Sequence, residues 1–294
     1  MALTPAQRLR EARRRRAEAQ PPPRPPKPPP TTTRGELRAR IPIAIVAIVA
    51  GVVVIAQGGI TFTIAMILLG WVCLHELFGM FESANPSRLA AALALPAILL
   101  AANYGTQYHV FLMLVLAVPA VFFAVAFQRA QGGAGAIALT MLGIYYIGIA
   151  LAHAVLLINL PHGDGIIVST LIGTFVGDTG AFIGGRLLGR TKLAPQISPN
   201  KTVEGLVIGL VFGIAAVWFA GVYQDYLTGL QALLLGSVVC VVAPVGDLFA
   251  SYLKRDARVK DTGSLFGAHG GALDRLDAAL FTGVAAYFLW ATML

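Results

Sequence analysis

Residues 251–277 concentrate the side chains of this sequence that could do chemistry. They read SYLKRDARVKDTGSLFGAHGGALDRLD and carry nine Asp, Lys and Arg residues between two strongly apolar segments. Four of the basic residues lie in the first ten positions, and Asp274 and Asp277 flank Arg275 near the end. Clustered lysines and arginines bind phosphate groups, and carboxylates are the ligands that Mg²⁺ prefers. The segment therefore predicts an enzyme site for a phosphorylated substrate and a divalent metal ion.

A second polar block, residues 177–205, ends one apolar segment and opens the next. Its basic residues are Arg186, Arg190, Lys192 and Lys201. Its glycines would let two helices approach closely. Packing does not explain the stretch ISPNKTVEG, in which Thr202 is a candidate N-cap of the following helix. We expect the donors of this block to hold a phosphate group.

Three more carboxylates, Glu76, Asp178 and Asp247, fall inside apolar segments. A charge inside a membrane span costs roughly 3 kcal/mol, so such residues usually face the interior of a helix bundle and mark a site or pathway. In the nine-span topology described below, these three residues lie at the same depth, near the cytoplasmic face of the membrane, as Asp274 and Asp277. A structural ion pair with a neighbouring basic residue is the alternative for each of them.

His269 precedes Gly270 and Gly271, which would let backbone approach a ligand. The histidine itself is open to three interpretations: a ligand, a proton carrier or a hydrogen-bonding strut. The two cysteines, Cys73 and Cys240, lie in apolar segments and are interpreted as packing residues.

The composition of the chain indicates which class of fold positions these residues. The 294-residue chain is 57% hydrophobic and 12% charged, with a mean hydropathy of +0.75, which excludes a soluble globular domain. We predict an all-α polytopic integral membrane protein of about nine transmembrane helices. The predicted spans are residues 41–57, 60–78, 89–102, 108–127, 136–158, 165–183, 203–222, 228–250 and 278–294.

The chain divides by composition into three regions. Residues 1–40 contain RRRR and PPPRPPKPPP and few large apolar side chains, so we predict a disordered basic cytoplasmic tail held near anionic headgroups. Residues 41–160 would form N-terminal transmembrane helices, and residues 161–294 a C-terminal catalytic region. Nucleic acid is a poor explanation for the net charge of +8, because the basic residues lack interleaved aromatics and adjoin a membrane.

The distribution of charge predicts an orientation. Eleven of the 22 Lys and Arg residues precede residue 41, and the other eleven all fall in loops after the second, fourth, sixth and eighth spans. Basic residues favour the cytoplasmic side. We therefore expect a cytoplasmic N-terminus, an outward C-terminus and a site that faces the cytoplasm, in the inner (plasma) membrane of the cell.

Both polar blocks resemble the integral-membrane phosphatidate cytidylyltransferases, also called CDP-diacylglycerol synthases. The later block follows that family's pattern at Ser251, Lys254, Arg255, Lys260, Asp261, Gly263, His269, Gly270, Gly271, Asp274, Arg275 and Asp277. The earlier block follows it at Asp178, Gly185, Arg186, Gly189, Arg190, Lys192, Ser198, Pro199, Lys201, Thr202, Glu204 and Gly205. The similarity covers residues 165–280, and it departs at Gly267 and Ala268, where the family usually has Pro then Gly.

The resemblance implies the reaction of CTP with phosphatidic acid to give CDP-diacylglycerol and pyrophosphate. It implies a requirement for Mg²⁺ held by Asp247 and Asp274, and leaves a second metal ion or a monovalent cation open. It also implies a homodimer in the lipid bilayer.

We assign roles to the matching residues as hypotheses. Asp277 would support the metal ligands or bind a second metal ion. Lys254, Arg255 and Lys260 would neutralise the triphosphate, Lys201 and Arg275 would bind phosphate of nucleotide or lipid, and Asp178 would act on the nucleotide side. The other residues expected to bind substrate are Arg186, Ser198, Asn200, Asp261, His269, Gly270 and Gly271.

Two other functions fit part of the pattern. A CTP-dependent lipid kinase, or a cytidylyltransferase for another lipid phosphate, could share the nucleotide and metal machinery. An ion-coupled transporter would use Asp178 and Asp247 as intramembrane ion sites, but the first four spans lack a counterpart of the charged segments that an inverted repeat would supply.

Overall fold

Apolar helices make up nearly all of the regular structure in the part of the chain that the computed structural model describes, residues 48–127, 133–263 and 270–294. A lipid-exposed backbone must satisfy its own hydrogen bonds, which a helix does within one segment. Residues 50–294 form one compact unit. The basic tail predicted over residues 1–40 and the candidate ligand His269 lie outside the described residues.

The first half of the described residues is almost entirely helical. A helix over Ile48–Gln57 comes first. It is followed by α3 (Gly59–Met80), the 3₁₀ turn η1 (Glu82–Ala84), α4 (Arg88–Tyr104), α5 (Gln107–Phe127), α6 (Gly133–Gly143), the π-helical turn η2 (Ile144–Ile149) and α7 (Ala150–Ile158).

The second half contains the longest helices and one small sheet. Its elements are α8 (Gly163–Leu188), β1 (Lys192–Ala194), β2 (Ser198–Thr202), α9 (Val203–Val222), α10 (Gly229–Asp256) and α11 (Leu273–Met293). The two strands pair antiparallel, with Lys192 opposite Thr202. The sequence did not predict this hairpin, since a short polar segment of this kind carries no hydropathy signal.

Seven helical segments of the described residues are long and apolar enough to cross a bilayer. The other two predicted spans coincide with the shorter apolar helices Ile48–Gln57 and Arg88–Tyr104. The chain is thus a polytopic membrane protein, as predicted. Three helices extend five or more residues beyond an end of their predicted spans. The helix α8 runs to Leu188 instead of residue 183, α10 continues past residue 250 to Asp256, and α11 begins at Leu273 instead of residue 278. A span predicted from hydropathy ends at the first charged residues, whereas the backbone hydrogen bonds of the helix continue through them.

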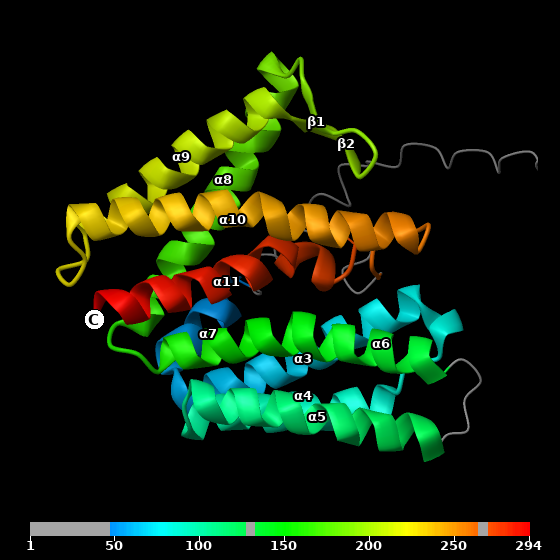
Figure 1. The fold of residues 1–294 in the computed structure, drawn as a ribbon. Helices are drawn as coiled ribbons and strands as arrows, with labels where there is room; N and C mark the ends of the chain where they lie inside the picture. The colour runs from blue at the N-terminus through cyan, green and yellow to red at the C-terminus, as the bar shows by residue number, and fades with distance from the viewer. Residues whose placement is uncertain (1–47, 128–132, 264–269) are drawn as a thin grey trace, which may run out of the picture. The chain divides into compact units, whose positions relative to one another are not determined.

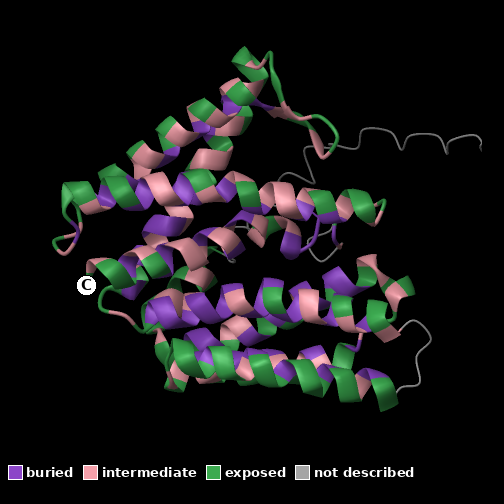
Figure 2. Ribbon diagram, viewed as in Figure 1, coloured by how far each residue is buried: buried purple, intermediate pink, exposed green. Residues whose placement is uncertain are grey.

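The helices of the unit form two groups around a central pair. Figure 1 shows α10 and α11 side by side, with α9 and the hairpin on one side of them and α3 to α7 on the other. The helix α8 crosses behind this pair and connects the two sides. The span formed by α6, η2 and α7 is the most buried of the apolar helices, whereas α5 and α9 are largely exposed (Figure 2). Large aromatic side chains such as Phe122 on α5 and Phe219 on α9 are among the exposed residues. Such outward apolar faces suit contact with lipid.

Small residues bring α8 and α9 together. Along α9 the buried residues recur every fourth position: Gly205, Gly209, Gly213, Val217 and Gly221. A Cβ added at Gly209 would lie 2.6 Å from the carbonyl oxygen of Gly177 on α8. This close backbone approach is the role expected from glycines spaced by four in membrane helices, and it places the loop between α8 and α9 over α10.

Candidate active site

A cavity of about 610 Å³ lies where α8, β2, α9, α10 and α11 meet. Four carboxylates line it: Asp178, Asp247, Asp274 and Asp277. Three basic residues line it as well: Arg186, Lys201 and Lys254. Residues that are separated by up to about a hundred positions in the sequence therefore meet at one place. Of the five carboxylates expected at one depth, four line the cavity and Glu76 does not.

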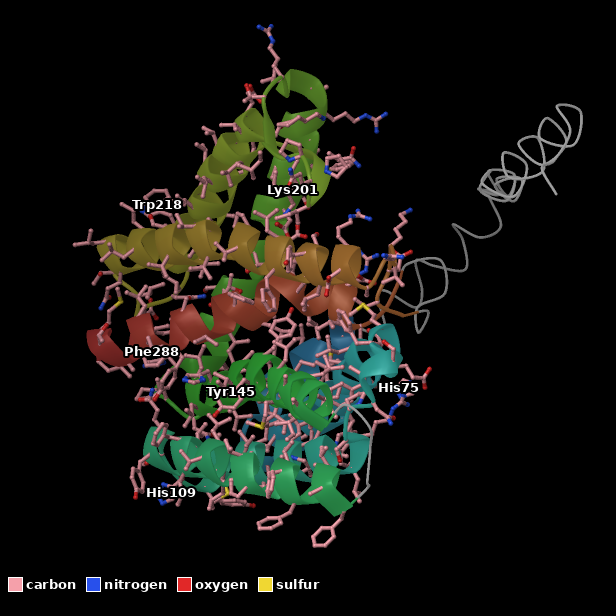
Figure 3. The ribbon with its side chains drawn as sticks, turned by 45° about the vertical axis from the view of Figure 1, so that its right-hand side comes forward. His75, His109, Tyr145, Lys201, Trp218 and Phe288 are labelled. Carbon is pink, nitrogen blue, oxygen red and sulfur yellow. The ribbon has the colours of Figure 1, made fainter. Side chains whose placement is uncertain are left out.

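Two lysines of the cavity are paired with aspartates from other elements. Lys201, on β2, forms an ion pair with Asp247 on α10. Figure 3 shows Lys201 on the hairpin above α10. The Nζ atom of Lys254 on α10 lies 2.8 Å from Oδ1 of Asp274 on α11. The first pair is about a quarter exposed, whereas the side chains of Lys254 and Asp274 are only 14% and 9% exposed.

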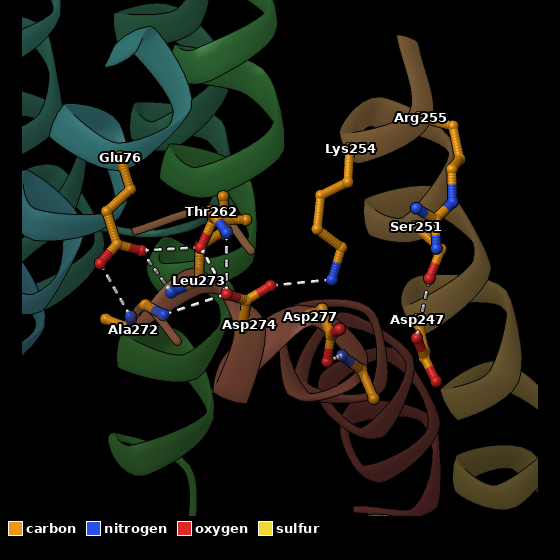
Figure 4. Close-up of polar contacts among 12 residues, drawn as sticks. Glu76, Asp247, Ser251, Lys254, Arg255, Thr262, Ala272, Leu273, Asp274 and Asp277 are labelled. Atoms are coloured by element: carbon orange, nitrogen blue, oxygen red, sulfur yellow. Dashed lines mark hydrogen bonds and ion pairs between the residues drawn. The ribbon is translucent and has the colours of Figure 1, made fainter. Parts of the chain in front are cut away.

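One face of α10 carries most of these groups. Asp247, Ser251 and Lys254 follow one another at helical spacing, so their side chains share a face. Ser251 donates its hydroxyl proton to Oδ1 of Asp247 at 3.3 Å (Figure 4). The extension of α10 beyond its predicted end is what brings Lys254 to the cavity.

Asp274 is the most heavily bonded carboxylate of the cavity. Its Oδ2 atom accepts hydrogen bonds from the backbone amides of Thr262 at 2.8 Å and Gly271 at 3.0 Å, and lies 3.1 Å from the Thr262 hydroxyl. Its Oδ1 atom accepts from Lys254. Because α11 begins before Asp274, Asp277 lies about one turn further along the same helix, with Oδ1 accepting from the amide of Ala278 at 2.8 Å.

The hairpin that carries Lys201 is held by its neighbours. Thr202 caps α9, as predicted, by accepting a hydrogen bond from the amide of Gly205 at 3.1 Å. Glu204 accepts from the amides of Arg190 at 3.0 Å and Thr191 at 3.1 Å. Arg255 donates from Nε to the carbonyl of Ile197 at 3.2 Å. Arg255 therefore anchors the hairpin turn to the end of α10.

The predicted site residues divide into two groups in the structure. Arg186 and Asn200 line the cavity together with the aspartates and lysines named above. Among the described residues, the predicted residues outside the cavity lining are Ser198, Arg255, Lys260, Asp261, Gly270, Gly271 and Arg275. Gly270 has a φ of +83°, which accounts for glycine at that position.

Sequence reasoning missed two contributors. Thr262 was not singled out, although its hydroxyl and amide contact Asp274. Glu76 was given no role, and its carboxylate contacts residues at the start of α11. The sequence offered two signals: a Thr-Gly pair inside a charged segment, and a glutamate inside an apolar helix. Neither signal identifies the residue that its side chain contacts.

The donor chemistry of the cavity fits a divalent cation. Carboxylate oxygens are the ligands that Mg²⁺ prefers, usually one or two together with substrate phosphates. Within the described ranges, no group of three or more His, Cys, Asp and Glu side chains is close enough to hold a metal ion by itself. Asp247 and Asp274 each face a lysine instead. Oxygen ligands for a cation are therefore present in one cavity, without a preformed cage.

Comparisons with known proteins agree on one family. The sequence profile of the "Cytidylyltransferase family" matches residues 38–293. A "Phosphatidate cytidylyltransferase" of Helicobacter pylori (strain J99 / ATCC 700824) is 34% identical over 248 residues, covering 82% of this chain and 90% of the relative. Proteins of the same name from Staphylococcus saprophyticus, 30% identical over 83% of this chain and 95% of the relative, and from Bacillus subtilis (strain 168), 31% identical over 87% and 98%, are also similar.

Proposed function

This chain belongs to the cytidylyltransferase family, and we propose that it transfers the cytidylyl group of CTP to phosphatidic acid, giving CDP-diacylglycerol and pyrophosphate. The observation that carries the proposal is the single cavity into which the two polar blocks bring four aspartates and three basic residues. The relatives named for this activity match over most of both chains.

The reaction joins two polyanions, which sets what the cavity must do. An oxygen of the lipid phosphate attacks the α-phosphorus of CTP; that O–P bond forms as the bond from the α-phosphorus to the bridging oxygen breaks, and pyrophosphate leaves with the electron pair. The lipid phosphate is already ionised at neutral pH, so no strong general base is needed. Catalysis then consists mainly of alignment and charge neutralisation.

The lysines and the arginine of the cavity supply the positive charge. Lys201, Lys254 and Arg186 would bind phosphate oxygens of the two substrates, and Asp178 would contact the nucleotide side. Asp247 and Asp274, supported by Asp277, would hold a Mg²⁺ ion, which supplies electrophilic stabilisation of phosphate oxygens when bound. The two ion pairs, Lys201 with Asp247 and Lys254 with Asp274, keep these charges balanced before substrates enter.

We extend the proposal to the position of the site in the membrane. All eleven basic residues after residue 41 fall in alternate loops of the nine-span topology, which supports a cytoplasmic N-terminus and a site at the cytoplasmic leaflet of the inner membrane. A homodimer is part of the same proposal and rests on the family resemblance alone.

The test is pyrophosphate release by the purified protein in detergent. We expect release that requires CTP, phosphatidic acid and Mg²⁺ together, and that stops when the metal ion is chelated and returns when Mg²⁺ is restored. Release without added lipid would refute the proposed acceptor, and full activity in the presence of chelator would refute the metal. A transporter would give no pyrophosphate.

A further inference from the structure

Glu76 is a buried carboxylate from the first half of the chain that binds the start of the last helix. It lies on α3 and is only 6% exposed. Among the described residues, it is not one of those that line the cavity. Oε1 accepts a hydrogen bond from the amide of Ala272 and Oε2 from the amide of Leu273, both at 2.9 Å. The neighbouring His75 points outward instead (Figure 3).

The surroundings of Glu76 are built to receive its carboxylate. The hydroxyl of Thr262 lies 3.0 Å from Oε2. Two glycines of the charged segment leave space for the carboxylate: a Cβ at Gly263 would lie 2.7 Å from Oε1, and a Cβ at Gly271 would overlap the same group. A buried carboxylate is tolerated only where donors compensate its lost hydration, and amides at a helix N-terminus do so with the help of the helix dipole.

One of the residues that bind Glu76, Thr262, also binds Asp274. Thr262 and Gly271 each donate to Asp274, and the Thr262 hydroxyl is within hydrogen-bond distance of both carboxylates (Figure 4). Asp274 in turn holds the ammonium group of Lys254 in the cavity. A continuous set of hydrogen bonds therefore runs from α3 through the start of α11 to α10.

We propose that Glu76 is a positioning residue for the transfer reaction, because it fixes Thr262 and the first turn of α11 and thereby holds Asp274 and Lys254 at the cavity. The inference rests on the proposed function. Displacement of aligned charges by about 1 Å costs a phosphoryl-transfer site up to about a hundredfold in rate. Loss of Glu76 should therefore slow turnover beyond what its effect on folding explains.

The test compares three variants of the full-length protein in detergent. Glu76→Gln keeps the side-chain length and removes the charge and one acceptor. Thr262→Val removes the hydroxyl shared by the two carboxylates and is the second variant should Glu76→Gln fail to fold. Thr63→Val is the matched control: Thr63 is fully buried on α3, and its hydroxyl lies 3.0 Å from both the Gly59 carbonyl and Asn103 Oδ1, away from the cavity.

Two readouts separate positioning from general stability. We expect kcat to fall about 30-fold in Glu76→Gln and about fivefold in Thr262→Val, with KM for CTP changed less than about threefold. Thr63→Val should keep kcat within about twofold of wild type at equal folded fraction. Hydrogen–deuterium exchange at residues 270–274 should accelerate about tenfold in the first two variants and not in the control.

The outcomes are decisive in either direction. A kcat of Glu76→Gln and Thr262→Val close to wild type, or an equal loss in Thr63→Val, would overturn the positioning role. A wild-type protein that makes no CDP-diacylglycerol would refute the proposed function and, with it, the positioning role for that reaction. That case is recognisable, because the exchange difference between Glu76→Gln and Thr63→Val would still be measured.

Discussion

The four aspartates of the cavity differ in what already binds them. Asp274 accepts hydrogen bonds on both oxygens and is almost completely buried, whereas Asp247 faces Lys201 and Ser251 and is about a quarter exposed. The carboxylates of Asp274 and Asp247 therefore lie in two different structural environments. Asp274 stabilises the start of α11 in addition to any role with substrate, and Asp247 does not.

Asparagine substitutions should separate these settings. We expect Asp247→Asn and Asp274→Asn each to lower turnover at least about a hundredfold, because each removes a charge from the reaction site. The free energy of unfolding should fall by about 3 kcal/mol in Asp274→Asn, which leaves Lys254 buried without its partner, and by less than about 1 kcal/mol in Asp247→Asn. Turnover and thermal unfolding in detergent measure both effects. Near-normal turnover of Asp247→Asn would contradict its assignment as a metal ligand.

Charge alone identified several residues of the cavity, although Arg255, Lys260, Asp261 and Arg275, predicted on the same ground, lie outside its lining. Asp178, Asp247, Asp274, Lys201 and Lys254 stand out in an apolar chain, and all five line the cavity. The part that was not predictable is the hydrogen bonding of neutral or distant groups. Thr262 contacts Glu76 although 186 positions of sequence separate them, and the local sequence around either residue does not predict this contact.

At the scale of elements, the packing of α8 on α9 sets where the hairpin and Lys201 lie. Replacing Gly209 by Ala would push a methyl group against the backbone of α8, which cannot move aside as a side chain would. We expect a loss of about 2 kcal/mol in unfolding free energy and a lower kcat. Gly283→Ala on α11 is the control, because a Cβ there has no neighbour within 4 Å. Equal melting temperatures for the two variants would contradict the packing role.

Hydropathy predicted the existence and order of the helices better than their ends. The charged ends of α10 and α11 were assigned to loops, yet they are helical and carry Lys254 and Asp274. Thr202 was predicted as an N-cap from local chemistry, and it is one. The β1–β2 hairpin depends on pairing between polar residues and on Glu204 and Arg255, which is tertiary information.

At the scale of the whole molecule, the proposed topology makes the two ends of α9 face opposite sides of the membrane. The native cysteines, Cys73 and Cys240, are both buried, so an introduced cysteine should dominate labelling. Gln196 in the hairpin turn and Asp225 between α9 and α10 are both exposed. In intact cells, a membrane-impermeant thiol reagent should label Asp225→Cys only, and Gln196→Cys should react after permeabilisation. Labelling of Gln196→Cys alone in intact cells would contradict the proposed topology and indicate the opposite orientation.

The most direct test of the account follows the phosphorus atoms of CTP. The protein is incubated with phosphatidic acid, Mg²⁺ and CTP labelled with ³²P at either the α or the γ position, and the lipid and water-soluble fractions are counted. Attack at the α-phosphorus predicts that the α label enters the lipid and the γ label stays in water-soluble pyrophosphate, and that Asp247→Asn transfers neither. Transfer of the γ label to lipid would instead identify a CTP-dependent kinase and contradict the assigned reaction.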